Sequence, residues 1–260
     1  MRIPLYQVDA FADRVFGGNP AAVCPLESWL PDATMQAIAS ENNLSETAFF
    51  VREGDGYGLR WFTPTVEIDL AGHPTLATAH VIFTELAPER HDVRFRTKIG
   101  DTLIVTRDGP VLWMDFPARP PKKRDAFGDV AAALGATPLE VLAARDGFAV
   151  FARQADLRAL KPDMARIAAL DCFGLIATAP GDGCDFVSRY FAPGAGVPED
   201  PVTGSAHCTL IPYWAKRLGK TALEARQIST RGGTLHCEDR GHRVGIGGRA
   251  VTYLTGTIAL

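Results

Sequence analysis

The sequence has few cysteines and no long hydrophobic segment. Its five cysteines are an odd number, and no two of them form a CxxC pair. We therefore expect neither a disulfide framework nor a zinc site, and a reducing cytoplasm is the simplest compartment. No apolar run approaches the ~20 residues that a membrane-spanning helix needs. Residues 1–11 lack the apolar core of a signal peptide, so none is expected.

The chain also lacks a large excess of charge of either sign. Lys and Arg total 27, and Asp and Glu total 30, so the net charge is −3. This balance gives no electrostatic case for nucleic acid or an acidic membrane as a partner. A Walker phosphate loop, HExxH, GxSxG and a strand–GxGxxG–helix are missing as well. We expect the partner to be a small molecule.

What is present is ordinary globular composition over 260 residues, with 47% hydrophobic and 22% charged residues. That length predicts about two domains. Residues 117–124 (PARPPKKR) hold three prolines and four basic residues, which indicates an interdomain linker, although charge runs are also typical of a solvated surface. The predicted domains are residues 1–117 and 118–260. An alternative left open is that the last strand packs back on the N-terminal half.

Periodicity predicts many strands and few helices, which is an α+β fold. Two helices, at residues 75–86 and 205–218, are apolar nearly all round and should be wrapped by protein. A helix over residues 31–42 should bury Met35, Ile38 and Ala39. Further helices are predicted at 128–134, 138–144 and 163–170, with a turn at 17–20. Strands are predicted at 3–10, 21–24, 47–51, 58–62, 93–98, 102–106, 111–115, 147–152, 173–178 and 185–191, and four more close the chain.

The two halves of the sequence repeat one another. RWFTP at residues 60–64 matches RYFAP at residues 189–193. The shared order of the features that follow favours a duplication over chance similarity, and a duplicated αβ unit places a cleft between two facing halves. These features are an acidic residue (Asp69, Asp200), a glycine with its neighbour (Gly72-His73, Gly204-Ser205) and an apolar helix (Thr75-Leu76, Thr209-Leu210).

The two predicted helix starts are candidate anion sites. The free N–H groups and the dipole of a helix N-terminus hold an anion, and glycine lets the backbone come close to it. Gly72-His73 and Gly204-Ser205 could therefore bind a carboxylate from two sides. The alternative is that Gly204-Ser205 is only a turn and an N-cap, worth about 1 kcal/mol. The repeat favours the binding site.

Glu46 is the candidate acid–base residue, because it stands where a polar loop enters a very apolar strand. Burial against Ala48, Phe49 or Phe50 would raise its pKa, and such a carboxyl group can take a proton from carbon and return it. The alternative is a surface glutamate at a strand start. Its candidate partners are His73 and Asp200, each of which also has a purely structural interpretation as a turn residue.

His207 and Cys208 are adjacent on a predicted helix. Adjacent helical positions do not face one target, so we do not expect them to form a catalytic pair.

Long stretches of the sequence resemble one known family. They are VDAFADRVFGGNPAAV (8–23), ENNLSETAFF (41–50), LRWFTPTVEIDLAGHPTLATAH (59–80), SRYFAPGAGVPEDPVTGSAHCTLIPYWAKRLGK (188–220) and RGGTL (231–235). The chain resembles the PhzF-like (phenazine biosynthesis) family, which has the diaminopimelate epimerase-like fold. Residues 118–170 carry little of the match.

The resemblance implies two pseudo-symmetric halves, each a curled, mostly antiparallel sheet around a central helix. It also implies a site between the halves without a metal or organic cofactor, and a homodimer. In the family's pattern Glu46 is the acid–base residue, and His73, Asp200 and Ser205 are its companions. The implied activity is that of an isomerase, which moves a proton and a double bond on a small unsaturated carboxylic acid such as dihydro-hydroxyanthranilate.

The same fold hosts racemases and epimerases that use two cysteines, one before the glycine of each helix start. Here these places hold Ala71 and Thr203, which are not thiols. Racemisation is therefore disfavoured, and so is a related dehydratase, which would keep at least one thiol. An amino-acid racemase, epimerase or dehydratase and a non-catalytic binding protein remain as alternatives, because fold alone does not decide function.

Overall fold

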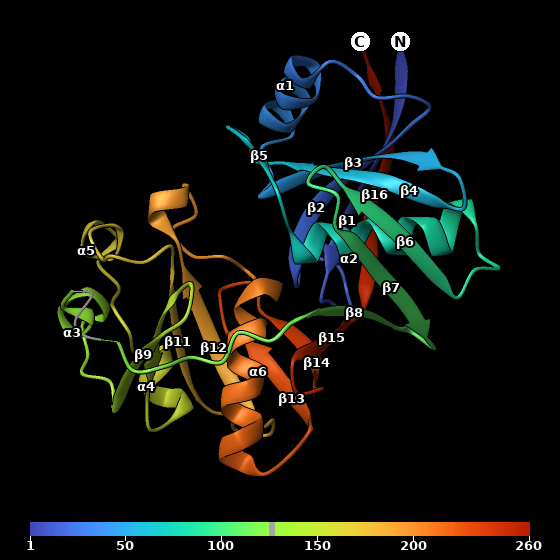
Figure 1. The fold of residues 1–260 in the computed structure, drawn as a ribbon. Helices are drawn as coiled ribbons and strands as arrows, with labels where there is room; N and C mark the ends of the chain where they lie inside the picture. Colours follow the sequence, from blue (N-terminus) through green and yellow to red (C-terminus); the bar gives the residue numbers. More distant parts are fainter. Residues whose placement is uncertain (125–127) are drawn as a thin grey trace. The chain divides into compact units, whose positions relative to one another are not determined.

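The computed structural model describes residues 1–124 and 128–260 (Figure 1). The chain divides into two compact units. Unit 1 comprises Met1–Asp115 and Gly247–Leu260, and unit 2 comprises Phe116–Ile246. The last strand, β16 (Ala250–Ala259), pairs antiparallel with the first, β1 (Arg2–Ala10), so the chain ends in the unit where it begins.

Unit 1 is a mixed sheet with the strand order β16-β1-β2-β3-β4-β6-β7-β8. The pairs β2–β3 and β4–β6 are parallel, and the other neighbours are antiparallel. A short strand, β5, pairs with β4 on the side of the sheet path. The bounds are β2 (Asn19–Leu26), β3 (Glu46–Glu53), β4 (Gly56–Phe62), β5 (Glu67–Ile68), β6 (Asp92–Thr97), β7 (Thr102–Asp108) and β8 (Val111–Pro117).

Helix α2 (Gly72–Val81) is the central helix of unit 1. All its residues except Gly72 and His80 are buried, and it packs against β1, β2, β3 and β16. A π-helical turn, Ile82–Leu86, continues it to the end of the predicted helix. The prediction of a wrapped helix holds for α2, which begins three residues earlier than expected, whereas residues 84–86 at the end of the predicted helix are exposed.

Helix α1 (Asp32–Asn42) covers another part of the sheet. It buries Met35, Ile38 and Ala39, as predicted. These side chains join a core cluster that includes Phe49 and Phe62. Pro31 precedes the helix as its N-cap residue, and Asn43 ends it in the left-handed conformation.

Unit 2 repeats the strand plan of unit 1 with the order β9-β10-β11-β12-β13-β14-β15. From β9 to β14 its pairs run antiparallel, parallel, antiparallel, parallel, antiparallel. The pairs from β1 to β7 run in the same sequence. The predicted duplication and α+β fold are therefore confirmed. The bounds are β9 (Glu140–Ala143), β10 (Gly147–Val150), β11 (Leu175–Pro180), β12 (Phe186–Phe191), β13 (Ala222–Gln227), β14 (Gly233–Asp239) and β15 (Arg243–Gly248).

Helix α6 (Gly204–Leu218) is the central helix of unit 2. Trp214 stacks on Phe186 of β12, and its indole Nε1 donates to Thr178 Oγ1 of β11 at 2.9 Å. The opposite face of the sheet packs in a second cluster under three short helices, with Leu157 and Ile167 among its buried residues. These helices are α3 (Val130–Leu134), α4 (Gln154–Arg158) and α5 (Met164–Ala168).

The predicted helix over residues 138–144 is wrong. Glu140–Ala143 is strand β9, which pairs antiparallel with Gly147–Val150. Leu, Glu and Ala favour helix locally, but pairing next to the tight turn at residues 144–146 outweighs that weak preference. The predicted turn at residues 17–20 is also too long, because β2 already begins at Asn19.

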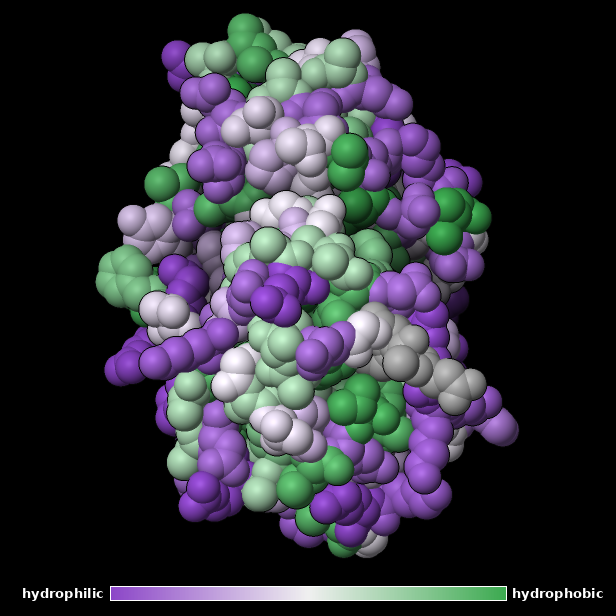
Figure 2. All heavy atoms as spheres, turned by 90° about the vertical axis from the view of Figure 1, so that its left-hand side faces the viewer, coloured by the Kyte–Doolittle hydropathy of each residue, from purple (hydrophilic) through white to green (hydrophobic). Residues whose placement is uncertain are grey.

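On the face drawn in Figure 2, hydrophobic and hydrophilic residues are intermingled. Within the described residues, no helix has both the length and the apolar composition to cross a membrane.

Candidate active site

The first cluster of predicted site residues lies in unit 1, at the starts of three elements. Strand β2 begins at Asn19, β3 begins at Glu46, and α2 begins at Gly72. Because β2 and β3 are parallel and Ala21 is level with Glu46, their N-terminal ends meet at the same edge of the sheet. The start of α2 lies at this edge as well, since His73 contacts both Asn19 and Glu46.

Glu46 and His73 are in direct contact. The Oε2 atom of Glu46 lies 3.1 Å from His73 Nε2, and the two side chains are only 15% and 7% exposed. On the other side of the ring, Asn19 Nδ2 lies 3.2 Å from His73 Nδ1. Ser45 Oγ donates to Asn19 Oδ1 at 3.5 Å and so helps to orient the amide. The imidazole is thus held between a carboxyl group and an amide.

Burial controls the charge of His73. Desolvation lowers its pKa to about 3, and a backbone hydrogen bond at Pro20 acts weakly in the opposite sense. The ring is therefore neutral at pH 7 and carries one proton. Asn19 Nδ2 is a donor, so His73 Nδ1 accepts there and the single ring proton is on Nε2, the nitrogen that faces Glu46. Nε2 and the Glu46 carboxyl oxygen therefore lie next to one another in a buried position.

The apolar wall next to Glu46 differs from the expected one. Side chains alternate along a strand, so Glu46 shares its face of β3 with Ala48 and Phe50. Phe49 points to the opposite face, into the core beside Met35 and Phe62. The suggestion that Phe49 helps to bury the Glu46 carboxyl group is therefore wrong.

The start of α2 carries no side-chain cap. Its N-cap residue, Ala71, makes no side-chain hydrogen bond, and Gly72 is partly exposed. Inside the helix, Thr75 Oγ1 donates back to the Ala71 carbonyl at 2.6 Å. The geometry leaves the helix start available to an anion.

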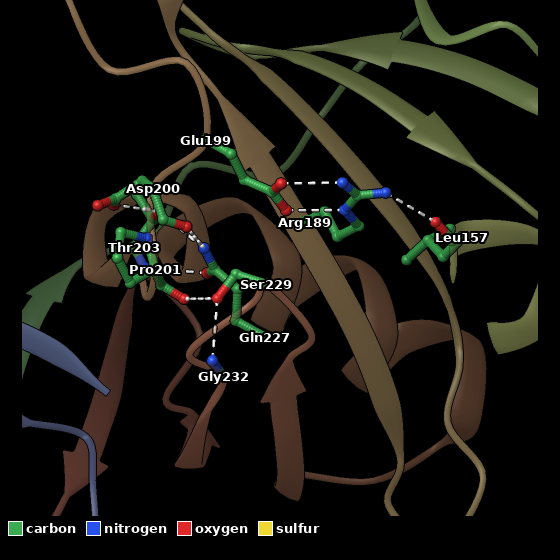
Figure 3. A network of polar contacts seen from close by, with 9 residues as sticks. All are labelled: Leu157, Arg189, Glu199, Asp200, Pro201, Thr203, Gln227, Ser229 and Gly232. Carbon is green, nitrogen blue, oxygen red and sulfur yellow. Dashed lines mark hydrogen bonds and ion pairs between the residues drawn. The ribbon is translucent and has the colours of Figure 1, made fainter. Parts of the chain in front are cut away.

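The second cluster lies in unit 2 at the start of α6, as Figure 3 shows. The N-cap residue is Thr203, whose hydroxyl donates to Asp200 Oδ2 at 2.5 Å rather than capping the helix. Gly204 and the partly exposed Ser205 are the first two residues of α6. The alternative that Gly204-Ser205 is an N-cap is wrong, because the cap position belongs to Thr203.

Each unit carries an arginine–glutamate pair before its central helix. Arg60 binds Glu67 with two hydrogen bonds of 2.7 and 2.8 Å. Arg189 binds Glu199 in the same way, with the same distances. In unit 1 this hydrogen bonding raises the pKa of Arg60 and lowers that of Glu67. Both arginines belong to the sequence repeat, but the sequence does not reveal their pairing with glutamate.

The pairs also correct the register of the repeat. Glu67 and Glu199 each precede the helix glycine by five residues. Glu67 is therefore the counterpart of Glu199, and the match of Asp69 with Asp200 is wrong. In this register Ile68 corresponds to Asp200, so the Asp200 carboxylate belongs to one half alone.

The thiols in the core are poor bases. Burial raises the pKa of Cys208 to about 11 and that of Cys24 to about 12. His207 is fully buried, and its Nδ1 lies 2.8 Å from the Thr203 carbonyl oxygen. These features agree with the expectation that His207 and Cys208 are not a catalytic pair. No group of three or more His, Cys, Asp and Glu side chains placed to hold a metal ion occurs within residues 1–124 and 128–260.

His207 predicts a pH dependence of stability. Burial lowers its pKa to about 4, whereas an unfolded histidine titrates near 6.5. The unfolded chain therefore binds a proton first as pH falls, and the native state loses stability between about pH 6.5 and 4. We expect His207→Asn to reduce the loss between pH 6 and 5 by about 1 kcal/mol. Urea unfolding measures it, with exposed His91→Asn as the control; an unchanged slope would contradict the assignment.

The structure brings together Glu46, His73 and Gly72 in unit 1. In unit 2 it places Asp200 beside the start of α6, where Gly204 and Ser205 lie. Asn19 was missed as a site residue, although it belongs to the GGNPAAV stretch of the resemblance. That both clusters form one site between the units is a prediction.

Comparison with known proteins places the chain in a family. The family model described as phenazine biosynthesis-like protein (PhzC-PhzF) matches residues 8–256. A Pseudomonas aeruginosa protein named "uncharacterized isomerase" is 53% identical, and the match covers 100% of both chains. A crystal structure of a PhzF-family protein from Enterococcus faecalis has a TM-score of 0.97 and 49% identity, with 100% of both chains covered.

More distant structures share only the fold. A hydroxyproline epimerase from Agrobacterium vitis has a TM-score of 0.60 at 10% identity, covering 100% of this chain and 93% of that one. The chain belongs to the PhzC-PhzF family of phenazine biosynthesis-like proteins and is an isomerase with an epimerase-like α+β fold.

Proposed function

We propose that this isomerase moves a proton, and with it a double bond, on a small unsaturated carboxylic acid similar to dihydro-hydroxyanthranilate. The observation that carries the proposal is the contact of 3.1 Å between Glu46 and the neutral His73 at the edge of unit 1. A partly buried carboxyl group beside a neutral imidazole is suited to taking a proton from carbon and returning it.

In the proposed reaction the Glu46 carboxylate removes a proton from a carbon next to the double bond. The C–H electron pair forms a new C=C bond, and the former double bond supplies the pair that binds the returned proton at its far carbon. His73 holds the Glu46 carboxyl group in place and polarises the substrate. No net proton is gained or lost, so the cycle closes without a redox partner.

The carboxylate of the substrate binds at the start of α6 in this proposal. Gly204 and Ser205 supply backbone N–H groups, and the Ser205 hydroxyl adds one hydrogen bond. The Asp200 carboxylate orients or polarises a polar group of the substrate. Support comes from the uncapped helix start and from the partial exposure of Ser205.

Racemisation by two thiols is the weaker candidate. Ala71 stands at one of the two positions, and Thr203 at the other donates its hydroxyl hydrogen to Asp200. Neither side chain is a base near pH 7. A non-catalytic binding protein has no use for the buried Glu46–His73 pair, which makes it weaker still.

The proposed reaction can be tested in D₂O with dihydro-hydroxyanthranilate and related small unsaturated carboxylic acids. We expect the double bond to move, with deuterium at the carbon that receives the proton to the extent that the Glu46 carboxyl group exchanges with solvent, and no reaction at the α-carbon of saturated amino acids. Deuterium exchange at the α-carbon of amino acids, without movement of a double bond, would instead support the racemase.

Ser205→Ala should weaken substrate binding and leave turnover nearly unchanged. Removing one hydrogen bond costs about 1 kcal/mol, or roughly a fivefold rise in the dissociation constant. Calorimetric titration of the inactive Glu46→Gln background measures this directly. Ser40→Ala, at an exposed position of α1, is the matched control. Equal affinity in both variants would remove Ser205 from the binding site.

We also propose a cytoplasmic homodimer. Strand β16 is the end strand of the order in the described residues, and it carries no charged residue over Ala250–Ala259. Tyr253 and Leu254 are exposed on it. An uncharged edge strand favours pairing with another chain. Light scattering should give twice the chain mass of 28.0 kDa; a monomer mass at micromolar concentration would contradict it.

A further inference from the structure

We propose that Gln227 is a positioning residue, which holds Asp200 in the geometry that the reaction needs. The inference rests on the proposed function of Asp200. Gln227 is the last residue of β13 and is 1% exposed. A buried carboxamide must have its hydrogen bonds satisfied, so its partners show what it organises.

Three hydrogen bonds join the Gln227 side chain to the segment that connects Asp200 with α6. Its Nε2 donates to the Asp200 carbonyl oxygen at 2.7 Å and to Thr203 Oγ1 at 3.1 Å. Its Oε1 accepts from the Thr203 backbone N–H at 2.9 Å. Figure 3 shows the amide beside the segment that holds Asp200 and Thr203. One side chain thus fixes both ends of a short loop.

Thr203 passes this constraint on to the Asp200 carboxylate. Its hydroxyl accepts from Gln227 and donates to Asp200 Oδ2, so the direction of that bond is set. Its carbonyl oxygen is bound by His207 Nδ1. Every polar group of Thr203 therefore has a partner. The carboxylate of Asp200 cannot rotate without breaking the bond to Thr203.

A second side chain from the same region fastens the middle of the loop. Ser229 Oγ donates to the Pro201 carbonyl oxygen at 2.7 Å and accepts from the Gly232 N–H at 3.0 Å. Gln227 and Ser229 follow one another closely at the end of β13. The loop is therefore held at Asp200, Pro201 and Thr203 by hydrogen bonds from one segment (Figure 3).

Unit 1 shows that the fold itself does not require these hydrogen bonds to the loop before the central helix. Ser188 is level with Gln227, and Leu59 is level with Thr97, each next to the arginine of its repeat. Thr97 is therefore the counterpart of Gln227. Its hydroxyl accepts from the Asp101 N–H within its own turn. The segment before α2 is instead held by β5, which pairs with β4.

The two repeats also differ in whether they carry a carboxylate at the position of Asp200. The position of Asp200 is occupied by Ile68 in unit 1, which has no carboxylate to orient. Only the half with the carboxylate places a glutamine at the end of the equivalent strand. We infer that the amide serves the placement of Asp200 rather than the stability of the strand pair.

The test is Gln227→Met, which keeps the length of the side chain and removes its hydrogen bonds. Displaced reacting groups can cost ~10²-fold, so we expect kcat/KM for dihydro-hydroxyanthranilate to fall about 10²-fold. In the absence of substrate, hydrogen exchange at residues 200–205 should become at least about tenfold faster. Gln154→Met, which removes one bond to the Asp182 N–H in the same unit, is the matched control.

The effect of Gln227→Met in an Asp200→Asn background distinguishes a positioning role from a merely structural one. If Gln227 acts through Asp200, Gln227→Met should lower kcat/KM there by less than about threefold, because coupled residues are not additive. The full loss in that background, or exchange and kcat/KM equal to those of Gln154→Met, overturns the inference. Should Gln227→Met not fold, Ser229→Ala must show the same two changes in smaller size, and its failure to do so also overturns it. If wild type turns over no substrate, the proposed function fails. The hydrogen-exchange rates still decide whether Gln227 holds residues 200–205 in place.

Discussion

Glu46→Gln is expected to bind substrate and to turn it over about 10²–10⁴-fold more slowly than wild type, which is the usual loss when general acid–base catalysis is removed. Glutamine keeps the shape of the side chain and can still face His73 Nε2, which lies 3.1 Å from the carboxyl oxygen. It cannot take a proton from carbon. The loss should therefore fall on kcat, measured by single-turnover kinetics, while the dissociation constant changes little.

Glu41→Gln is the control for this replacement, since Glu41 is an exposed glutamate at the end of α1. It should retain wild-type kcat. If Glu46→Gln turns substrate over at a rate near that of wild type, Glu46 is not the acid–base residue. His73 would then be the next side chain to test.

Gly18→Ala is expected to destabilise unit 1 by about 3 kcal/mol or more, the sum of left-handed strain and a forced overlap. Gly18 has a φ of +62°, and a Cβ atom there would lie 2.0 Å from the Ala10 carbonyl oxygen. Backbone cannot move aside as a flexible side chain could. The next residue, Asn19, contacts His73, so the clash also disturbs the site. Urea denaturation measures the change in the free energy of unfolding.

Gly54→Ala separates backbone strain from steric overlap. Gly54 has nearly the same φ, +60°, but a Cβ atom there would meet nothing within 4 Å. Its expected cost is about 1 kcal/mol, which is the strain alone. Equal costs for the two variants would show that the overlap at Gly18 relaxes freely.

The central helices were predictable from composition, whereas the short elements were not. Apolar residues on most sides of 75–86 and 205–218 favour burial, and α2 and most of α6 are buried, while residues 84–86 and 216–218 are exposed. Glu140–Ala143 is too short for its period to distinguish helix from strand. Its partner, Gly147–Val150, decides the matter through long-range pairing rather than local preference.

The same distinction holds for the candidate site. Glu46 and His73 could be named from sequence because the chemistry of carboxyl and imidazole groups limits the candidates. Their contact depends on the packing of α2 against β3, which a single sequence does not reveal. Gln227 gave no signal, because a glutamine at the end of a strand resembles any polar residue. Its importance arises from three hydrogen bonds to residues that lie more than twenty positions earlier.

The measurement that tests the central claim most directly is a crystal structure of Glu46→Gln with dihydro-hydroxyanthranilate bound. The proposal requires one site made by both clusters. It predicts the substrate carboxylate on the N–H groups of Gly204 and Ser205, and the carbon that loses its proton within about 3–3.5 Å of the residue 46 side chain. A substrate bound away from the start of α6, or with no carbon near residue 46, would contradict it.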